Sequence, residues 1–378
     1  MPIPPFDNVH VAYQSNQVVT DFLRDGKIPS DSSATDRLID YCLEHKEFNA
    51  LSWLGLRSES ICCRNLDAEK LKNLGEWLAS SPPVTTLHLG GNDIGEAGTE
   101  VIASALIKNH TLTTLNLWSN AIGNGGATHL AYALKVNRTL TTLSIGDNNI
   151  GDTGAMMLGA ALAENPTLAI LILSRNNIAF AGANMLSVGL KQNTTLTILA
   201  LPENRIGDQG AVALKDALLA NGTLTWLDLE QNDIGAAGAS ALALGLEKNR
   251  TLTTLSLGRN RIGDEGAMSF ASALRSNATL SALELAWNRI GDTGVTALRS
   301  ALTENRSLTS LDLAYNQSIH SQPVAAAYID LCLQKYAEAN QHCRVSDIST
   351  TIVEQLSLID PELVHQLSFA YTSTPPAQ

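Results

Sequence analysis

The sequence predicts an α/β solenoid, in which short strand–turn–helix–turn units stack side by side. Three observations predict it: asparagines recur every 28 residues, an apolar strand pattern precedes each of them, and an apolar helix pattern follows. One such unit cannot bury its apolar side alone, so the units must stack. The recurring asparagines are Asn92, Asn120, Asn148, Asn176, Asn204, Asn232, Asn260, Asn288 and Asn316.

The strand pattern comes first in each unit. Leu255 and Leu257 alternate with other residues, and this alternation places both leucines on one face of a short strand. An Ile-Gly-Asp motif follows the asparagine, and an aspartate readily accepts hydrogen bonds from the free N–H groups at a helix start. We therefore expect these aspartates to cap the helices of their own units: Asp152, Asp208, Asp264 and Asp292.

The helix pattern follows the motif. Ala155, Leu158 and Leu162 lie at positions i, i+3 and i+7, which form one apolar stripe along a helix. A second asparagine, such as Asn277, comes where each helix must end, and we expect it in the left-handed conformation. In one unit Phe180 replaces the aspartate, so we expect that helix to lack its cap.

Stacking of the units predicts one parallel sheet with the helices on its other face. Neighbouring strands lie about 4.8 Å apart, whereas packed helices need about 8–10 Å. Because the helical side takes the longer arc, we expect an open horseshoe with the sheet on its concave face. The recurring asparagines fall at tight turns, where we expect them to be buried and to bond backbone groups of adjacent units.

The unit Thr251 to Asn277, TLTTLSLGRNRIGDEGAMSFASALRSN, carries a resemblance to a known family. It resembles the leucine-rich-repeat family in its 28-residue, ribonuclease-inhibitor-like form, and the resemblance covers about residues 83–318. Similar repeats occur in NOD-like receptors, in Ran GTPase-activating proteins and in effectors of intracellular bacteria such as Legionella. The resemblance implies a scaffold that binds proteins, and it does not identify the partner.

The ends of the chain depart from the repeat. Leu51, Leu54 and Leu56 resemble the strand pattern, and DAEKLKNLGEWLAS, from Asp67 to Ser80, resembles the capped helix. Open solenoid ends expose sheet edges and apolar faces, so they need caps. We expect a helical N-terminal cap at 1–47, a degenerate first repeat at 48–82, regular repeats at 83–318, and a helical C-terminal cap with a flexible tail at 319–378.

The composition limits the classes of partner. A formal net charge of −12 repels phosphate backbones and anionic membranes, and no basic patch is evident in the sequence. No segment approaches the roughly 20 apolar residues of a membrane-spanning helix, and the start, Met-Pro-Ile-Pro-Pro, lacks the features of a signal peptide. We therefore expect a cytoplasmic protein that binds neither nucleic acid nor membrane.

No catalytic motif is evident. The sequence has no phosphate-binding loop of the G-x-x-x-x-G-K-[ST] type, no H-E-x-x-H motif and no G-x-S-x-G elbow. Cys62 and Cys63 are adjacent, which is not the spacing of a zinc site. We expect no enzymatic activity, no cofactor and no bound metal.

Four places of the pattern L-x-x-L-x-L-x-x-N serve neither the core nor the turn. The third, fifth, seventh and eighth places vary between units and should face the concave side. They carry aromatic residues and arginines, which are common interface hot spots, and carboxylates in the C-terminal half. The candidate contact residues are Trp118, Arg175, Glu203, Trp226, Asp228, Glu230, Arg259, Glu284, Trp287, Asp312 and Tyr315.

The function expected from these features is a monomeric protein-interaction scaffold. An acidic, aromatic patch suits a basic or amphipathic segment of a partner protein. If the chain is a bacterial effector, the partner is a host protein in the host cytosol. Two alternatives stay open: a GTPase activator similar to Ran GTPase-activating proteins, and an inhibitor of a basic enzyme. A further alternative is an ordinary hydrophilic face, on which the tryptophans lie flat against neighbouring strands or under the C-terminal cap.

Overall fold

The computed structural model describes residues 39–48, 51–52, 60–63 and 66–316 of the chain. It divides the chain into two compact units, Met1–Ala200 and Leu201–Gln378. The predicted repeat region, 83–318, is therefore shared between two units. The predicted C-terminal cap and tail lie outside the described residues, as does most of the N-terminal cap.

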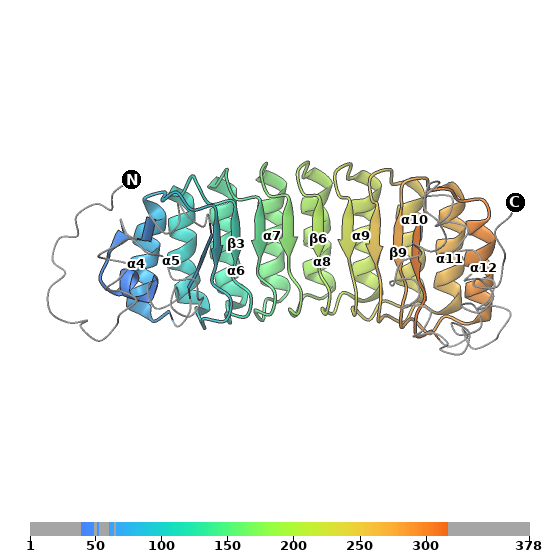
Figure 1. The fold of residues 1–378 in the computed structure, drawn as a ribbon. Helices are drawn as coiled ribbons and strands as arrows, with labels where there is room; N and C mark the ends of the chain where they lie inside the picture. The colour runs from blue at the N-terminus through green and yellow to red at the C-terminus, as the bar shows by residue number, and fades with distance from the viewer. Residues whose placement is uncertain (1–38, 49–50, 53–59, 64–65, 317–378) are drawn as a thin grey trace, which may run out of the picture. The chain divides into compact units, whose positions relative to one another are not determined.

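Among its described residues, the first unit contains six strands that pair in parallel in the order of the chain. From β2 onward the paired positions are 28 residues apart, as in Thr86↔Thr114. In Figure 1 its helices lie behind its strands, in the same order. The strands are β1 (Ser60–Cys62), β2 (Thr86–His88), β3 (Thr114–Asn116), β4 (Thr142–Ser144), β5 (Ile170–Ile172) and β6 (Ile198–Ala200). The helices described between them are α4 (Ala68–Ala79), α5 (Gly95–Lys108), α6 (Gly123–Val136), α7 (Asp152–Glu164) and α8 (Phe180–Gln192).

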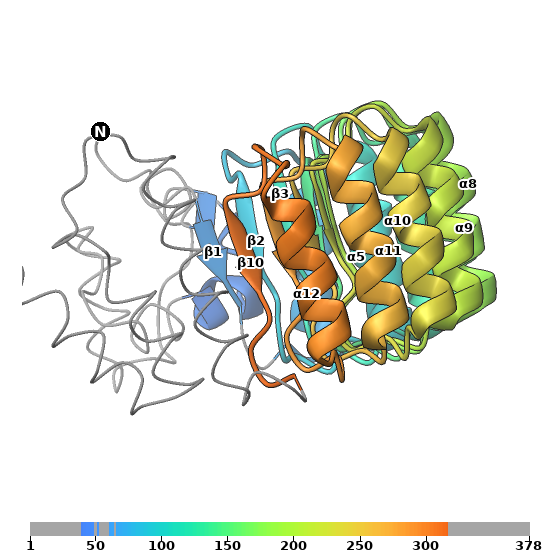
Figure 2. The ribbon, with the colours of Figure 1, turned by 90° about the vertical axis from the view of Figure 1, so that its right-hand side faces the viewer.

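The second unit repeats the arrangement. Its parallel strands pair in the order β7, β8, β9, β10. Helices α10, α11 and α12 lie side by side, as Figure 2 shows. The elements are α9 (Gly207–Ala220), β7 (Trp226–Asp228), α10 (Ala236–Lys248), β8 (Thr254–Ser256), α11 (Gly263–Ser276), β9 (Ala282–Glu284), α12 (Asp292–Leu302) and β10 (Ser310–Asp312). The predicted α/β solenoid of stacked strand–turn–helix–turn units is thereby confirmed.

The core lies between the sheet and the helices of each unit. In the repeat of β8, Leu252, Leu255, Leu257 and Ile262 are completely buried, and so is Leu274 of the following helix, α11. Burial of a leucine or isoleucine side chain contributes about 1.5–3 kcal/mol. The predicted apolar pattern thus defines the packed interior.

The recurring asparagines form a buried hydrogen-bonded ladder, as predicted. Asn120 accepts a hydrogen bond on Oδ1 from the backbone N–H of Asn92, at 2.9 Å. Its Nδ2 donates to the carbonyl oxygens of Leu89, at 2.8 Å, and of Trp118, at 3.1 Å. Each such amide therefore satisfies turn backbone in its own repeat and in the preceding one, which explains why the residue type recurs.

The predicted helix capping is wrong in one respect: Asp152, Asp208 and Asp264 cap the helix of the next repeat, and the repeat after Asp292 lies outside the described residues. Asp208 Oδ1 accepts hydrogen bonds from the N–H groups of Gly235, at 2.6 Å, and Gly238, at 3.0 Å. These groups lie at the start of α10, whereas Asp208 itself lies in α9. Asp152 and Asp264 bond the following helices in the same way. These side chains therefore join neighbouring repeats.

The unit with Phe180 keeps its capped helix for the same reason. Asp152 Oδ1, in the preceding repeat, accepts hydrogen bonds from the N–H groups of Ala179 and Gly182 at the start of α8, both at 2.8 Å. Phe180 instead presents a ring that is 45% exposed. The expectation that this helix lacks a cap is therefore wrong.

The second asparagines are extended, not left-handed as expected. Asn277 has φ −81° and ψ 129°. Its Oδ1 accepts from the N–H of Leu280, at 2.9 Å, and its Nδ2 donates to the carbonyl oxygen of Leu246 in the preceding helix, at 2.8 Å. A second buried ladder thus follows the C-terminal ends of the helices, where the last carbonyl groups of a helix lack internal partners.

The first repeat is displaced from its expected strand position. Leu51 lies in a helical segment, and the strand is β1, Ser60–Cys62, which pairs with β2. Helix α4 lies within the expected range, and Asp67 Oδ1 caps it by accepting from the N–H of Lys70, at 2.8 Å. The offset between paired residues is therefore 26 here, in Ser60↔Thr86, so this repeat is shorter than the others.

Candidate functional site

The eighth place of the pattern has a left-handed backbone in every repeat. Arg259 has φ 56°, Trp287 has φ 57° and Tyr315 has φ 58°. A bulky residue is uncommon in this region of backbone space. The turn is held by the parallel ladder, since Arg259 N donates to the carbonyl oxygen of Ala286, at 2.8 Å, and Trp287 N to that of Ala314, at 2.9 Å. The fold thus fixes a row of variable side chains just beyond the ends of the strands.

The sheet face of the second unit combines an exposed tryptophan with carboxylates. Trp226, the first residue of β7, is 44% exposed. Along the sheet it is in register with Thr254, Ala282 and Ser310. The side chains of these three residues are smaller than the tryptophan ring. The next outward-facing row along the sheet holds half-buried acidic residues. We call this set the acidic strip: Asp228, Glu230, Glu284 and Asp312.

Asp228 is the most perturbed member of the acidic strip. Burial raises the pKa of its carboxyl group above the ordinary value of 3.8, and the negative charges of Glu230 and Glu284 raise it further. Hydrogen bonds from the backbone of Glu230 and from the hydroxyl of Ser256 lower the pKa, but less than burial raises it. Folding therefore disfavours the charge on Asp228, and a cation bound beside the strip would favour it.

We expect Asp228→Asn to raise the melting temperature at pH 7. Because the folded-state pKa is raised, ionised Asp228 destabilises the fold above that pKa, and the cost disappears below pH 3.8, where the group is protonated in both states. Thermal unfolding between pH 3 and pH 8 measures this difference. The exposed Asp147→Asn serves as the control, with little change at either pH. A lower melting temperature for Asp228→Asn at pH 7 would contradict the assignment.

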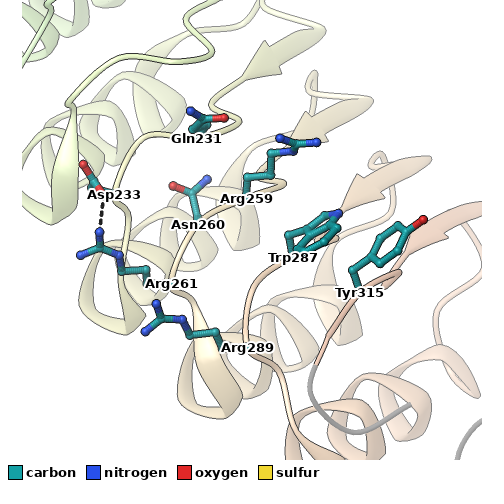
Figure 3. A pocket seen from close by; sticks show the side chains of 8 residues that line it. All are labelled: Gln231, Asp233, Arg259, Asn260, Arg261, Trp287, Arg289 and Tyr315. Atoms are coloured by element: carbon teal, nitrogen blue, oxygen red, sulfur yellow. Dashed lines mark ion pairs between the residues drawn. The ribbon is translucent and has the colours of Figure 1, made fainter. Parts of the chain in front are cut away.

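Aromatic and basic residues follow the strands at the turn edge of the same unit. The rings of Trp287 and Tyr315 stack with centroids 4.4 Å apart and an interplanar angle of 17°. The guanidinium of Arg259 lies over Trp287, 5.9 Å from the ring centroid. Trp287 is therefore held between a cation and a second aromatic ring, as Figure 3 shows. Both kinds of contact are favourable for an exposed ring.

These residues belong to an open groove of about 540 Å³. Two of its three arginines form ion pairs: Arg259 Nε lies 3.2 Å from Glu230 Oε1, and Arg261 Nη2 lies 2.8 Å from Asp233 Oδ1. We call it the arginine groove. It is lined by Gln231, Asp233, Arg259, Asn260, Arg261, Trp287, Arg289 and Tyr315.

The eleven candidate residues are divided between the two units. Trp118 and Arg175 lie in the first unit, and the other nine lie in the second. Trp118 is half-buried, with its ring against Gly146, where any side chain would collide with it. The alternative that a tryptophan lies flat on a neighbouring repeat therefore applies to Trp118. Trp287 also stacks against Tyr315 of the next repeat, yet it is 49% exposed, and Trp226 is 44% exposed.

The sequence reasoning missed Arg261 and Arg289. Both occupy the tenth place of the pattern, directly after the ladder asparagine. This place is not one of the four that were expected to face the concave side. Their side chains are exposed and line the arginine groove. The available signal was the pair of segments Arg-Asn-Arg at 259–261 and Trp-Asn-Arg at 287–289, which puts cations on both sides of a buried asparagine.

The described residues give no sign of a metal centre or a membrane span. They contain no cluster of histidine, cysteine and acidic side chains that could hold a metal ion. None of the helices among them is both long enough and apolar enough to cross a membrane. Cys63 is buried and forms no disulfide bond with a described residue.

Comparison with known sequences identifies the repeats. The family model described as "Leucine Rich repeat" matches eight segments: 80–103, 108–131, 136–159, 192–215, 220–243, 248–271, 276–298 and 304–322. The unit that contains Phe180 is not among the matched segments, although it forms β5 and α8 like its neighbours. No curated protein matches the chain.

Solved structures resemble parts of the chain at low sequence identity. Leiomodin-1 actin-binding site 2 is 22% identical, with 43% of this chain and 92% of that chain covered and a TM-score of 0.38. The tropomodulin C-terminal domain of Caenorhabditis elegans is 14% identical, with 42% and 96% covered and a TM-score of 0.36. TLR13 in complex with ssRNA13 is 18% identical, with 68% and 38% covered and a TM-score of 0.42. We infer no binding partner of this chain from these similarities.

Proposed function

Since the chain is built of leucine-rich repeats, we propose that it is a non-enzymatic scaffold that binds a partner protein on the sheet face of β7–β10. Repeats of this kind imply a protein-interaction role. The observation that carries the site is the exposed ring of Trp226 beside the acidic strip. Large exposed aromatic side chains mark interaction surfaces, and tryptophan is the residue type most enriched in binding hot spots.

The geometry favours a partner segment that is both apolar and basic. Trp226 is the first residue of a row of aligned strand positions in β7–β10, and the other residues of this row, Thr254, Ala282 and Ser310, are smaller. An apolar side chain of the partner can lie on this row against the ring. Lysine or arginine side chains beside it would face the acidic strip, where opposite charge speeds association and selects against acidic partners.

The proposal includes a monomeric state, a cytoplasmic location and the absence of enzymatic activity. We also propose that the repeats belong to the 28-residue, ribonuclease-inhibitor-like form and that the chain is similar to effectors of intracellular bacteria. In the effector case, the same surface would meet a host protein in the host cytosol. Stimulation of GTP hydrolysis by any member of a panel of small GTPases would contradict the non-enzymatic assignment.

We expect Trp226→Ala to weaken partner binding about tenfold or more, which corresponds to about 1.4 kcal/mol. Affinity capture from a eukaryotic lysate supplies the partner, and titration of the purified partner measures the dissociation constant. Tyr132→Ala is the matched control, because Tyr132 is an aromatic residue on helix α6 that is 56% exposed. Equal affinity of Trp226→Ala and the unaltered chain would exclude this face as the main contact surface.

A further inference from the structure

The arginine groove differs in charge from the sheet face beside it. Three arginines and one aspartate line it, on a chain whose net charge is −12. The positive side chains come from consecutive repeats: Arg259 and Arg261 follow β8, and Arg289 follows β9. We propose that this groove binds an acidic peptide segment of a protein, at a site separate from the contact proposed for Trp226.

The arginines can exchange their present partners at low cost. In the pair of Arg261 with Asp233 the side chains are 61% and 57% exposed, and in the pair of Arg259 with Glu230 they are 57% and 42% exposed. Exposed ion pairs contribute about 0–1 kcal/mol, so a carboxylate of a ligand can replace Asp233 or Glu230. Arg289 forms no ion pair with a described residue, and its guanidinium can receive a carboxylate directly.

The pairing geometry of arginine suits carboxylates. A guanidinium presents N–H donors in a planar fork that matches the two oxygens of a carboxylate. Arg261 and Arg289 occupy the same place of the pattern in adjacent repeats, whose strands β8 and β9 pair in parallel. Figure 3 shows both side chains on the same side of the groove. Neighbouring acidic side chains of an extended peptide can therefore each meet one arginine.

The aromatic residues argue against a nucleic-acid ligand. Base recognition by this groove would need a free ring face on which a base can stack. Trp287 has Tyr315 on one face and the guanidinium of Arg259 toward the other. The stack instead offers an apolar edge that can contact aliphatic parts of a peptide. An acidic peptide therefore fits the groove better than an RNA strand does.

The test uses the full chain and a fluorescein-labelled hexaglutamate peptide, followed by fluorescence anisotropy at roughly 50 mM salt, where screening is weak. We expect saturable binding that weakens at least tenfold in the double variant Arg261→Ala, Arg289→Ala. Arg205→Ala is the matched control, since Arg205 is exposed at the same place of another repeat and does not line the groove. Circular dichroism checks that each variant is folded.

Three outcomes would overturn the proposal. One is no saturable binding of hexaglutamate, and another is equal binding by the double variant and the unaltered chain. The third is tighter binding of an oligouridylate than of hexaglutamate, with that binding lost in the double variant, which would make the groove a nucleic-acid site. Trp226→Ala should leave hexaglutamate binding unchanged, so a failure of the groove and a failure of the sheet-face contact are distinguishable.

Discussion

Replacement of Asn176 by alanine is expected to lower the free energy of unfolding by roughly 4 kcal/mol. Asn176 Oδ1 accepts hydrogen bonds from the backbone N–H of Asn148, at 3.1 Å, and of Ile150, at 2.9 Å. Its Nδ2 donates to three carbonyl oxygens, those of Ile145, Leu173 and Ser174. Alanine removes all these partners at once, and a buried polar group left without a partner costs about 1–3 kcal/mol.

Urea unfolding followed by circular dichroism measures this loss. The chain offers a matched control in Asn177→Ala, the same substitution at the next residue, whose side chain is exposed. We expect that variant to stay within about 0.5 kcal/mol of the unaltered protein. Equal stabilities of the Asn176 and Asn177 variants would show that the ladder is not a main source of stability.

Replacement of Gly189 by alanine is expected to cost roughly 2 kcal/mol, even after the gain in helix propensity. Helices α7 and α8 approach each other through glycines: a side chain at Gly189 would overlap the backbone carbonyl oxygen of Gly159. A side chain at Gly159 would in turn overlap the carbonyl oxygen of Met185. Because the obstacle is backbone, one helix must move to accommodate a methyl group.

The same unfolding measurement applies to this variant. Gly222→Ala is the control, because an added methyl group there meets no atom within 4 Å. We expect that change to be neutral or slightly stabilising, since alanine restricts the unfolded chain. If Gly189→Ala is as stable as Gly222→Ala, the close approach of α7 and α8 has no energetic consequence.

The sequence predicted the regular parts of the fold because each repeat carries the same local information. The leucines and the ladder asparagines lie where the period places them, and their burial follows. The aspartate caps were assigned to the wrong helix because Asp208 lies in the first turn of its own helix, α9, close to where a capping residue would stand in the sequence. Only the stacking of repeats brings it to Gly235, 27 residues later.

The candidate site was predicted in part. The exposure of Trp226 follows from strand alternation, which places it on the face opposite Leu227. Trp118 was misjudged because its environment depends on Gly146, one repeat later, which leaves room for the ring. The arginine groove could not be read from strand alternation, since Arg261 and Arg289 follow the strands and converge only through stacking.

The cross-repeat aspartates have a consequence for how the second unit can open. The carboxylate of Asp208 in α9 accepts hydrogen bonds from the start of α10, and the carboxylate of Asp264 in α11 accepts them from the start of α12. The equivalent residue in α10 is Ala236, and α10 and α11 are bridged by the hydroxyl pair Ser240 and Ser269, at 2.7 Å. Charged acceptors hold more strongly than neutral ones. We therefore expect local opening of the second unit to begin between α10 and α11, where no charged acceptor joins the helices, next to the arginine groove, whose residues Arg261 and Arg289 lie before and after α11.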